Sequence, residues 1–358
     1  MQVLFKTNYD QDINYLVDRG ERVRVLLALA LALIAPLVVG GYFLSELTMF
    51  LVYIIAGLGL MVLVGFTGMV SFGHGAFLGI GAYTHSVLLG YGLPFFITLP
   101  AGALAAGLIG AALGRAASKM HGFYMAIATL AFAIVVETGI GAWEHVTGGH
   151  MGLSVPPMAA FGWEVTAGPL QYYLILALVV FCIWGVANLM RSPTGRAFVA
   201  VRDSETSARS LGLNIARTRI KAFFISAMLT GLAGGLLSHL VFYLSPESFG
   251  VNESLKLLLM VIVGGLGTIT GAIFGAVFVS ILPNLINLLQ NFLPSSIAEA
   301  AGLEQLLFGA IISGFIMFEP EGLYGRWRKL RLFIETFPYY KRATFTRQKR
   351  YLKTERFR

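Results

Sequence analysis

Long apolar stretches separated by short polar ones dominate the chain from residue 25 to residue 319. A membrane-spanning helix needs about 20 such residues. Ten stretches approach that length: 25–44, 47–66, 69–90, 94–114, 121–141, 170–190, 220–243, 254–271, 272–290 and 303–319. In the run 254–290, the sequence GGLGTITG predicts a turn between two short spans, and one tilted or broken helix is the alternative. Because helices satisfy their own backbone in lipid, we predict an all-α, polytopic membrane bundle.

Basic residues between these stretches predict how the bundle is oriented, because cytoplasmic loops are enriched in Lys and Arg. The basic regions are the N-terminus, Arg115 with Lys119, residues 191–221 and the tail from Arg326. The loop 142–168 has no Lys or Arg, and Lys256 stands apart from the four regions. About ten transmembrane helices, with both termini cytoplasmic, place all four regions in the cytoplasm. Eight also keep the termini there, whereas nine would move the tail outside.

Composition divides the chain in the same way. Apolar residues make up 57% and charged residues 12%, about half the charged fraction of a soluble domain. We predict a cytoplasmic segment at 1–24, without a cleavable signal peptide, a transmembrane domain at 25–325 and a basic cytoplasmic tail at 326–358. The tail has twelve Lys and Arg with aromatic residues between them. This pattern favours anionic membrane lipid as its partner, and no nucleic acid.

The longest polar insertion, 191–219, predicts a cytoplasmic hairpin of two short helices. Its expected caps are Ser192 before Pro193 for the first helix, Asp203 for the start of the second, and Gly212 for its end. The alternative is a plain loop on the membrane surface. Since most connections have about 4–6 residues, a longer capped segment indicates that another protein docks there.

The stretch SFGHGAFLGIGAY, residues 71–83, combines small residues with a histidine inside an apolar run. Gly75 and Gly79 form a G-x-x-x-G pattern, with Ser71 one turn earlier, and this spacing lets helices approach closely in a membrane. It also allows a discontinuous helix at 67–75, whose N–H groups would face a polar substrate.

Ionisable residues inside the predicted spans are few, and we expect the midplane to be poor in them. His74 and His85 lie about 16 Å apart along one helical face, too far to share an ion. His74 serves either a helix-packing hydrogen bond or a transport pathway, and His85 suits the outer interface. Glu137 is a pathway candidate, or reaches water near its helix end. The lone Cys182 excludes an internal disulfide, and we predict no metal, cofactor or catalytic site in this chain.

Five motifs in one order carry a family resemblance. They are SFGHGAFLGIGAY at 71–83, GFYMAIATLAFA at 122–133, TGGHMGL at 147–153, SPTGRAFVAVRDSETSARSLGLN at 192–214 and GGLGTITGAIFGA at 264–276. Together the chain resembles the permeases of branched-chain amino-acid ABC importers, in their LivM branch, over residues 25–325. Met69, His150 and Met151 depart from the usual family pattern.

The resemblance implies a permease subunit of the bacterial inner membrane that imports a small solute by alternating access and is no enzyme. Its implied partners are a LivH-like second permease, two cytoplasmic LivG/LivF-like ATPases that bind ATP and Mg, and an extracytoplasmic solute-binding protein. A branched-chain or other hydrophobic amino acid is the first substrate, with urea, an amide or an aromatic acid also possible within the family. The chain has no G-x-x-x-x-G-K-[ST] motif, so a phosphate-binding loop must come from a partner.

The residue patterns and the resemblance together give candidate roles to individual positions. For helix packing and the translocation pathway they are Ser71, Gly73, His74, Gly75, Gly79 and Glu137. For the outer loop they are Thr147, Gly148 and Gly149. For coupling to the ATPases they are Gly195, Arg196, Arg202, Asp203, Ala208 and Gly212. For the gate turn they are Gly264, Gly265 and Gly267.

Two other classes of function compete with this one. An ion-coupled secondary transporter or channel needs coupling acids or bases at the midplane, and an intramembrane enzyme needs clustered polar catalysts. His74 and Glu137 alone make no catalytic constellation, so the importer is preferred.

Overall fold

A computed structural model of the protein describes residues 19–120, 122–160, 163–165, 168–290, 303–318 and 321–336. Most of the predicted N-terminal segment 1–24, and the tail beyond residue 336, lie outside the described residues. The predicted boundary at 326 falls inside a helix, α16 (Gly322–Thr336).

Each of the ten predicted stretches overlaps one helix, and several helix ends lie a few residues away from the predicted ones. The helices are α2 (Arg19–Val38), α3 (Gly41–Leu60), α4 (His74–Gly90), α5 (Phe95–Ala116), α6 (Phe123–Ala142), α8 (Pro169–Arg191), α11 (Ile215–Val241), α12 (Val251–Gly264), α13 (Ile269–Gln290) and α15 (Leu303–Phe318). Within the described residues, six segments are long and apolar enough to cross a membrane: Gly41–Gly65, Phe95–Ala116, Phe123–Ala142, Pro169–Arg191, Ile215–Val241 and Ile269–Ile286. The structure is thus that of a polytopic helical membrane protein.

Shorter elements occupy the two ends of the bundle. The helical ones are the π-turn η1 (Met61–Gly65), η2 (Ala117–Lys119), α7 (Glu144–Thr147), η3 (Gly149–Met151), α9 (Pro193–Asp203), α10 (Glu205–Ser210) and η4 (Pro246–Phe249). The strands are β1 (Leu153–Ser154), β2 (Met158–Ala160), β3 (Trp163–Val165) and β4 (Tyr243–Leu244). β1 pairs antiparallel with β4, with Leu153 opposite Leu244, and β2 pairs antiparallel with β3.

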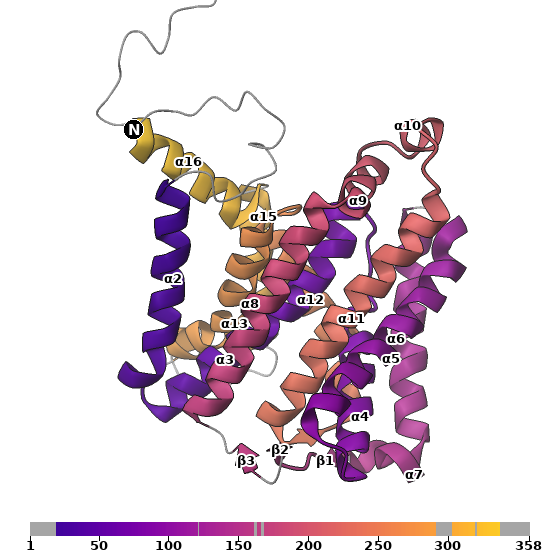
Figure 1. The fold of residues 1–358 in the computed structure, drawn as a ribbon, viewed down its shortest axis with the longest axis vertical. Coiled ribbons are helices and arrows are strands. Elements are labelled where there is room, and N and C mark those ends of the chain that lie inside the picture. The colour runs from indigo at the N-terminus through magenta and orange to yellow at the C-terminus, as the bar shows by residue number, and fades with distance from the viewer. Residues whose placement is uncertain are drawn as a thin grey trace, which may run out of the picture.

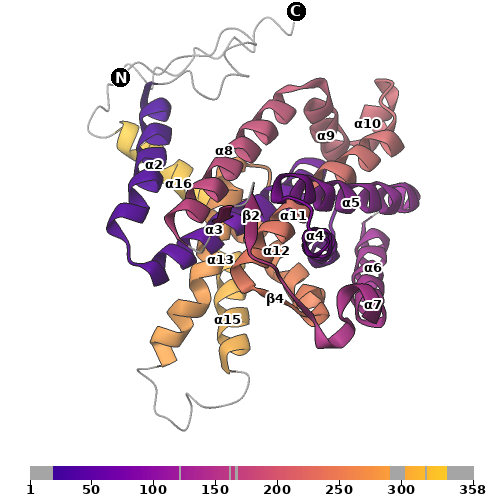
Figure 2. The same ribbon diagram turned by 60° about the horizontal axis from the view of Figure 1, so that its bottom comes forward.

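The two ends of the bundle differ (Figure 1). One end carries α9, α10, α16 and the first turn of α2, while α7 and the small strands lie at the other. Figure 2 shows the molecule rotated so that the end of the bundle with the small strands comes forward. In this view α2 lies at one edge, α6 and α7 lie at the opposite edge, and α4 and α11 lie between them. The predicted basic regions that the structure describes therefore gather at one end, which we call the hairpin end.

Glycines determine where several helices begin and end. α2 ends at Val38, earlier than the predicted residue 44, because the chain is extended at Gly40 and α3 begins directly after it. The predicted span 69–90 begins only at His74, and Gly68 has a φ of 70°. Between α12 and α13, Gly265 and Gly267 have φ values of 113° and 77°, so two helices joined by a turn are confirmed.

The centre of the core lies where α11 crosses α4 and α5. A Cβ at Gly81 would overlap the backbone of Gly231, and a Cβ at Gly234 would overlap the carbonyl of Leu78. These glycines allow the two backbones to touch, as small residues do between membrane helices. Phe77 and Phe223, both fully buried, pack around the crossing of these helices.

Candidate functional site

His74 lies at the first residue of α4 and is fully buried. Its Nδ1 is 2.9 Å from Ser71 Oγ, and its Nε2 is 2.7 Å from Ser226 Oγ on α11. Ser226 in turn donates a 2.6 Å hydrogen bond to the carbonyl of Gly59 on α3. Both ring nitrogens of His74 therefore have partners, and the histidine links three helices at the break before α4.

The glycine pattern at the start of α4 faces α12. The N–H of Gly75 donates a 2.8 Å hydrogen bond to Ser254 Oγ. A Cβ at Gly75 would lie 2.7 Å from the carbonyl oxygen of Gly250, and one at Gly79 would lie 2.9 Å from Phe249 Cβ. Gly73 contacts the backbone of Thr129 on α6 in the same way. The last residue of the break, Gly73, and the first two turns of α4 thus pack against α6, α11 and α12.

Glu137 lies on α6 with its carboxylate against the backbone of Gly250, which precedes the first residue of α12. The N-terminus of a helix carries a partial positive charge, so this position favours a carboxylate. Glu137 is half-buried. Its position next to α12 was not evident from the sequence, because the two residues are far apart along the chain.

The outer-loop residues form a tight turn at the end of the bundle opposite the hairpin. Thr147 is buried and donates a 2.6 Å hydrogen bond to the carbonyl of Ile140. Gly148 and Gly149 have φ values of 74° and 60°, a conformation that favours glycine. Next to this turn, β1 pairs with β4, so the loop is joined to the end of α11.

The predicted hairpin consists of α9 and α10. Ser192 accepts a 3.3 Å hydrogen bond from the N–H of Gly195 with Pro193 at the first helical position, as predicted. Gly212 has a φ of 82° after α10. The prediction that Asp203 caps the second helix was wrong by one residue: Ser204 is the cap and accepts from the N–H of Ser207.

The hairpin packs on the rest of the chain through buried side chains of α9 and α10 and through the junction between α8 and α9. Phe198 and Val201 of α9 and Ala208 of α10 are buried. A Cβ at Gly195 would overlap the backbone at the end of α8. Arg196 is exposed and donates a 2.8 Å hydrogen bond to the carbonyl of Arg191.

Arg202 links the hairpin to the break in the membrane helices. Its NH1 donates a 3.0 Å hydrogen bond to the carbonyl of Gly65, the last residue of the π-turn η1. Its NH2 lies 3.1 Å from Asp203 Oδ1. Carbonyls at helix ends lack partners within the helix, and a cationic donor there also complements the helix dipole. Arg202 thus fixes α9 to the end of the α3–η1 segment.

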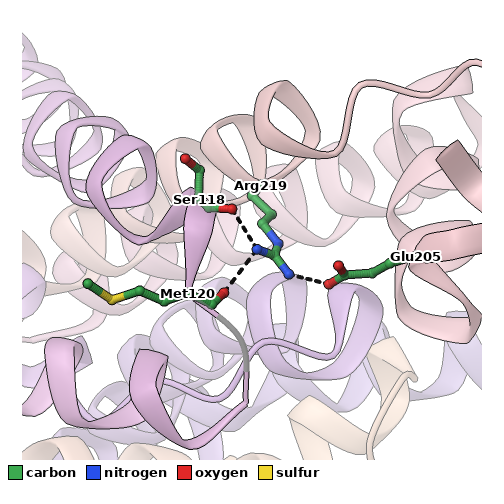
Figure 3. Close-up of polar contacts among 4 residues, drawn as sticks. All are labelled: Ser118, Met120, Glu205 and Arg219. Carbon is green, nitrogen blue, oxygen red and sulfur yellow. Dashed lines mark hydrogen bonds and ion pairs between the residues drawn. The ribbon is translucent and has the colours of Figure 1, made fainter.

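Arg219 forms a second link and was not among the predicted site residues (Figure 3). Its guanidinium donates to the carbonyls of Ser118 (2.7 Å) and Met120 (3.0 Å), which follow α5, and forms an ion pair with Glu205 of α10. The side chain is 3% exposed. One buried arginine of α11 therefore joins α10 to the end of α5. Its basic character was visible in the sequence, but its burial was not.

A cavity of about 280 Å³ lies beneath the hairpin, between these two links. Its lining comes from the break before α4, the start of α6, the α9–α10 turn and α11: Thr67, Gly68, Met69, Val70, Gly122, Met125, Val201, Arg202, Asp203, Ser204, Glu205 and Arg219. The hairpin therefore does not fill the space between itself and the break. A movement of α9 toward or away from the break would change the volume of this cavity.

The predicted gate turn packs against α16 and the hairpin. Gly264 contacts the backbone of Gly271, a Cβ at Gly265 would lie 3.2 Å from Tyr324 Cβ, and one at Gly267 would lie 2.9 Å from Arg202 NH1. The turn, the end of η1 and the hairpin thus meet at one place.

The pairing of two buried histidines, His85 and His239, was not evident from the sequence. His85, in the last two turns of α4, is fully buried, and its Nε2 lies 2.7 Å from Nε2 of His239 on α11. One of these rings must donate and the other accept, so they hold opposite roles. The signal was a second histidine, His239, at the end of another small-residue helix.

The polar contacts of Lys256 on α12 were not evident from the sequence. Lys256 donates a 2.9 Å hydrogen bond to the hydroxyl of Tyr53 and lies 3.8 Å from Glu253 Oε2. Tyr53 stands in the middle of the 25-residue segment Gly41–Gly65. Lys256, which the sequence set apart from the four basic regions, therefore contacts α3 beside the middle of this candidate span. Among the described residues, no three His, Cys, Asp or Glu side chains gather as a metal site would require.

Comparison with known proteins identifies the family. Residues 42–317 match the family model described as branched-chain amino acid transport system / permease component. The chain is 35% identical to the high-affinity branched-chain amino acid transport system permease protein LivM of Escherichia coli K12 over 273 residues, 69% of this chain and 64% of that protein. The chain thus spans less than two thirds of this relative's length.

Other relatives carry different names. A probable branched-chain amino acid transport permease protein LivH of Methanocaldococcus jannaschii is 24% identical, covering 79% of this chain and 92% of that protein. The autoinducer 2 import system permease protein LsrC of E. coli K12 / DH10B is 26% identical, covering 72% of this chain and 75% of that protein. No solved structure matches. Since the family model covers most of the bundle described above, the chain belongs to the family of permease components of branched-chain amino acid transport systems.

Proposed function

We propose that the chain is one of two permease subunits of an ATP-driven importer in the bacterial inner membrane, and that it imports a branched-chain or other hydrophobic amino acid. Family membership and the printed names of its relatives support this function. The higher identity to LivM than to LsrC favours an amino acid over autoinducer 2 as the substrate. Urea, amides and aromatic acids are substrates to be compared with it.

The chain requires partners for this function. A LivH-like subunit is the natural second permease, because a LivH protein is itself a relative of this chain. Two cytoplasmic ATPases would bind ATP and Mg, since no phosphate-binding loop motif occurs in this sequence. An extracytoplasmic binding protein would deliver the solute to the end that carries Thr147, Gly148 and Gly149. The chain itself would be no enzyme.

The proposed mechanism rests on one observation: the hairpin is bonded to the ends of two membrane helices. Arg202 holds α9 to the end of η1, and Arg219 joins α10 to the end of α5. When the ATPases close on ATP, the hairpin would move with them and shift η1 and α5. The break before α4 and the turn at Gly265 and Gly267 would then move relative to α12 and change access to the pathway.

A pull-down of the tagged chain from mildly solubilised native membranes tests this proposal. We expect a second permease and P-loop ATPases to co-purify, and the reconstituted complex to accumulate radiolabelled L-leucine only with ATP. Isolation of the chain alone, even after crosslinking, would contradict the proposal.

An ion-coupled secondary transporter or channel is the second candidate, because Glu253 and Lys256 lie beside Tyr53, the middle residue of the candidate span Gly41–Gly65, and ionisable residues inside a span mark ion pathways. It predicts that uptake depends on an ion gradient and continues when ATP is removed. Uptake measured in proteoliposomes with either energy source alone distinguishes the two.

A further inference from the structure

An ion pair lies inside the bundle where α3 and α12 meet. Glu253 and Lys256 are one turn apart on α12, with Lys256 Nζ 3.8 Å from Glu253 Oε2. The same ammonium donates a 2.9 Å hydrogen bond to Tyr53 Oη and lies 4.3 Å from the centre of the Tyr53 ring. Three polar groups from two helices thus form one cluster, the Tyr53–Glu253–Lys256 cluster.

The depth of this cluster makes it unusual. Tyr53 is the middle residue of the candidate span Gly41–Gly65, so its backbone lies about 18 Å from either end of that segment. A charge at this depth is unfavourable in lipid, and such residues face a bundle interior or an aqueous pathway. Glu253 and Lys256 side chains are 15% and 27% exposed, and the adjacent Asn252 is also exposed. The cluster therefore opens to one side of the chain.

The charges are only partly matched. The Oε1 atom of Glu253 is buried and has no hydrogen-bond partner among the described residues, and the Lys256–Glu253 contact is longer than a hydrogen bond. Buried polar atoms are normally paired. The cluster therefore keeps one free carboxylate position for a donor and one ammonium with bonding capacity for an acceptor.

We propose that the Tyr53–Glu253–Lys256 cluster recognises the two charged groups of an α-amino acid on the translocation path, Glu253 taking the ammonium and Lys256 the carboxylate. Tyr53 holds Lys256 in position. This inference rests on the proposed function and assigns the substrate class to particular side chains. The open side of the cluster then faces the pathway that the second permease completes.

Uptake of radiolabelled L-leucine by proteoliposomes that contain the whole transporter and its binding protein tests this assignment. Lys256→Met should lower uptake by about tenfold or more, with ATP hydrolysis still stimulated by the binding protein. Glu253→Gln, which keeps the side-chain size, should lower uptake similarly. Lys256→Arg should keep most of it. Lys221→Met, at an exposed lysine of α11, is the matched control and should transport normally.

The charge exchange Glu253→Lys with Lys256→Glu separates recognition from a structural ion pair. It keeps the pair and reverses the order of charges, so we expect uptake to stay low. Recovery of uptake in this double variant, or normal uptake by both single variants, would overturn the inference alone. A wild-type transporter that uses ATP and imports no amino acid would overturn the inference together with the proposed substrate, whereas a wild type that needs no ATP would overturn the proposed importer.

Discussion

The hairpin end and the centre of the bundle are held together by opposite kinds of contact. At the hairpin end, Arg202 and Arg219 reach across to carbonyls at the ends of neighbouring helices. At the centre, α4 and α11 touch through glycines, with backbone against backbone. Long side chains can follow a moving partner, whereas two touching backbones leave no room for adjustment. The comparison indicates a rigid centre and a hairpin end that can move.

The largest effect is expected where the rigid centre is broken. Gly81→Leu would place a side chain on the backbone of Gly231 and destabilise the packed bundle by about 3 kcal/mol or more. We expect the variant to accumulate poorly in membranes and to be lost on detergent extraction, as measured by fluorescence-detected size exclusion. Gly185→Leu, on α8, meets nothing within 4 Å and is the matched control. Equal behaviour of the two variants would contradict close packing at the crossing.

A smaller effect is expected at the hairpin end. Arg202→Gln removes the charged hydrogen bond to the carbonyl of Gly65 while leaving α9 packed through Phe198 and Val201. Because the Arg202 side chain is 37% exposed, its loss should lower uptake by about threefold to fivefold, the range of a partly solvated charged bond. Transport assays at equal protein level measure this. Unchanged uptake would show that α9 does not act through η1.

The smallest effect on transport is expected at His74. Ser226→Ala removes one partner of the buried ring and the bond to Gly59. Leaving the imidazole nitrogen unpaired should lower stability by about 1–2 kcal/mol and change uptake less than twofold. Thermal unfolding of the purified protein measures the change in stability, and a transport assay on the same variant measures the change in uptake. A strong loss of uptake without loss of stability would instead place His74 on the pathway.

The positions of the helices were more predictable from the sequence than the contacts between them. Apolar length predicted a helix in each of the ten stretches, and the pair Ser192 and Pro193 predicted the start of α9, because both signals are local. The pairs Arg219–Glu205, His85–His239 and Lys256–Tyr53 join residues whose proximity depends on helix packing, which the pattern of one chain does not encode. The end of α2 was missed because glycine at 40 and 41 looks like part of an apolar run. Asp203 was predicted as the cap because aspartate is a common capping residue. The next residue, Ser204, is also of a capping type, and it is Ser204 that caps α10.

The number of ATP molecules hydrolysed per L-leucine imported shows whether the hairpin transmits the ATPase cycle to the membrane helices. Arg219→Met in the reconstituted transporter removes the link between α10 and the end of α5, and Arg217→Met, at an exposed arginine two residues away, is its control. Because one buried guanidinium makes all three contacts of this link, we predict that the ratio rises by about tenfold or more in Arg219→Met and stays at the wild-type value in Arg217→Met. An assembled Arg219→Met transporter with the wild-type ratio would contradict the account.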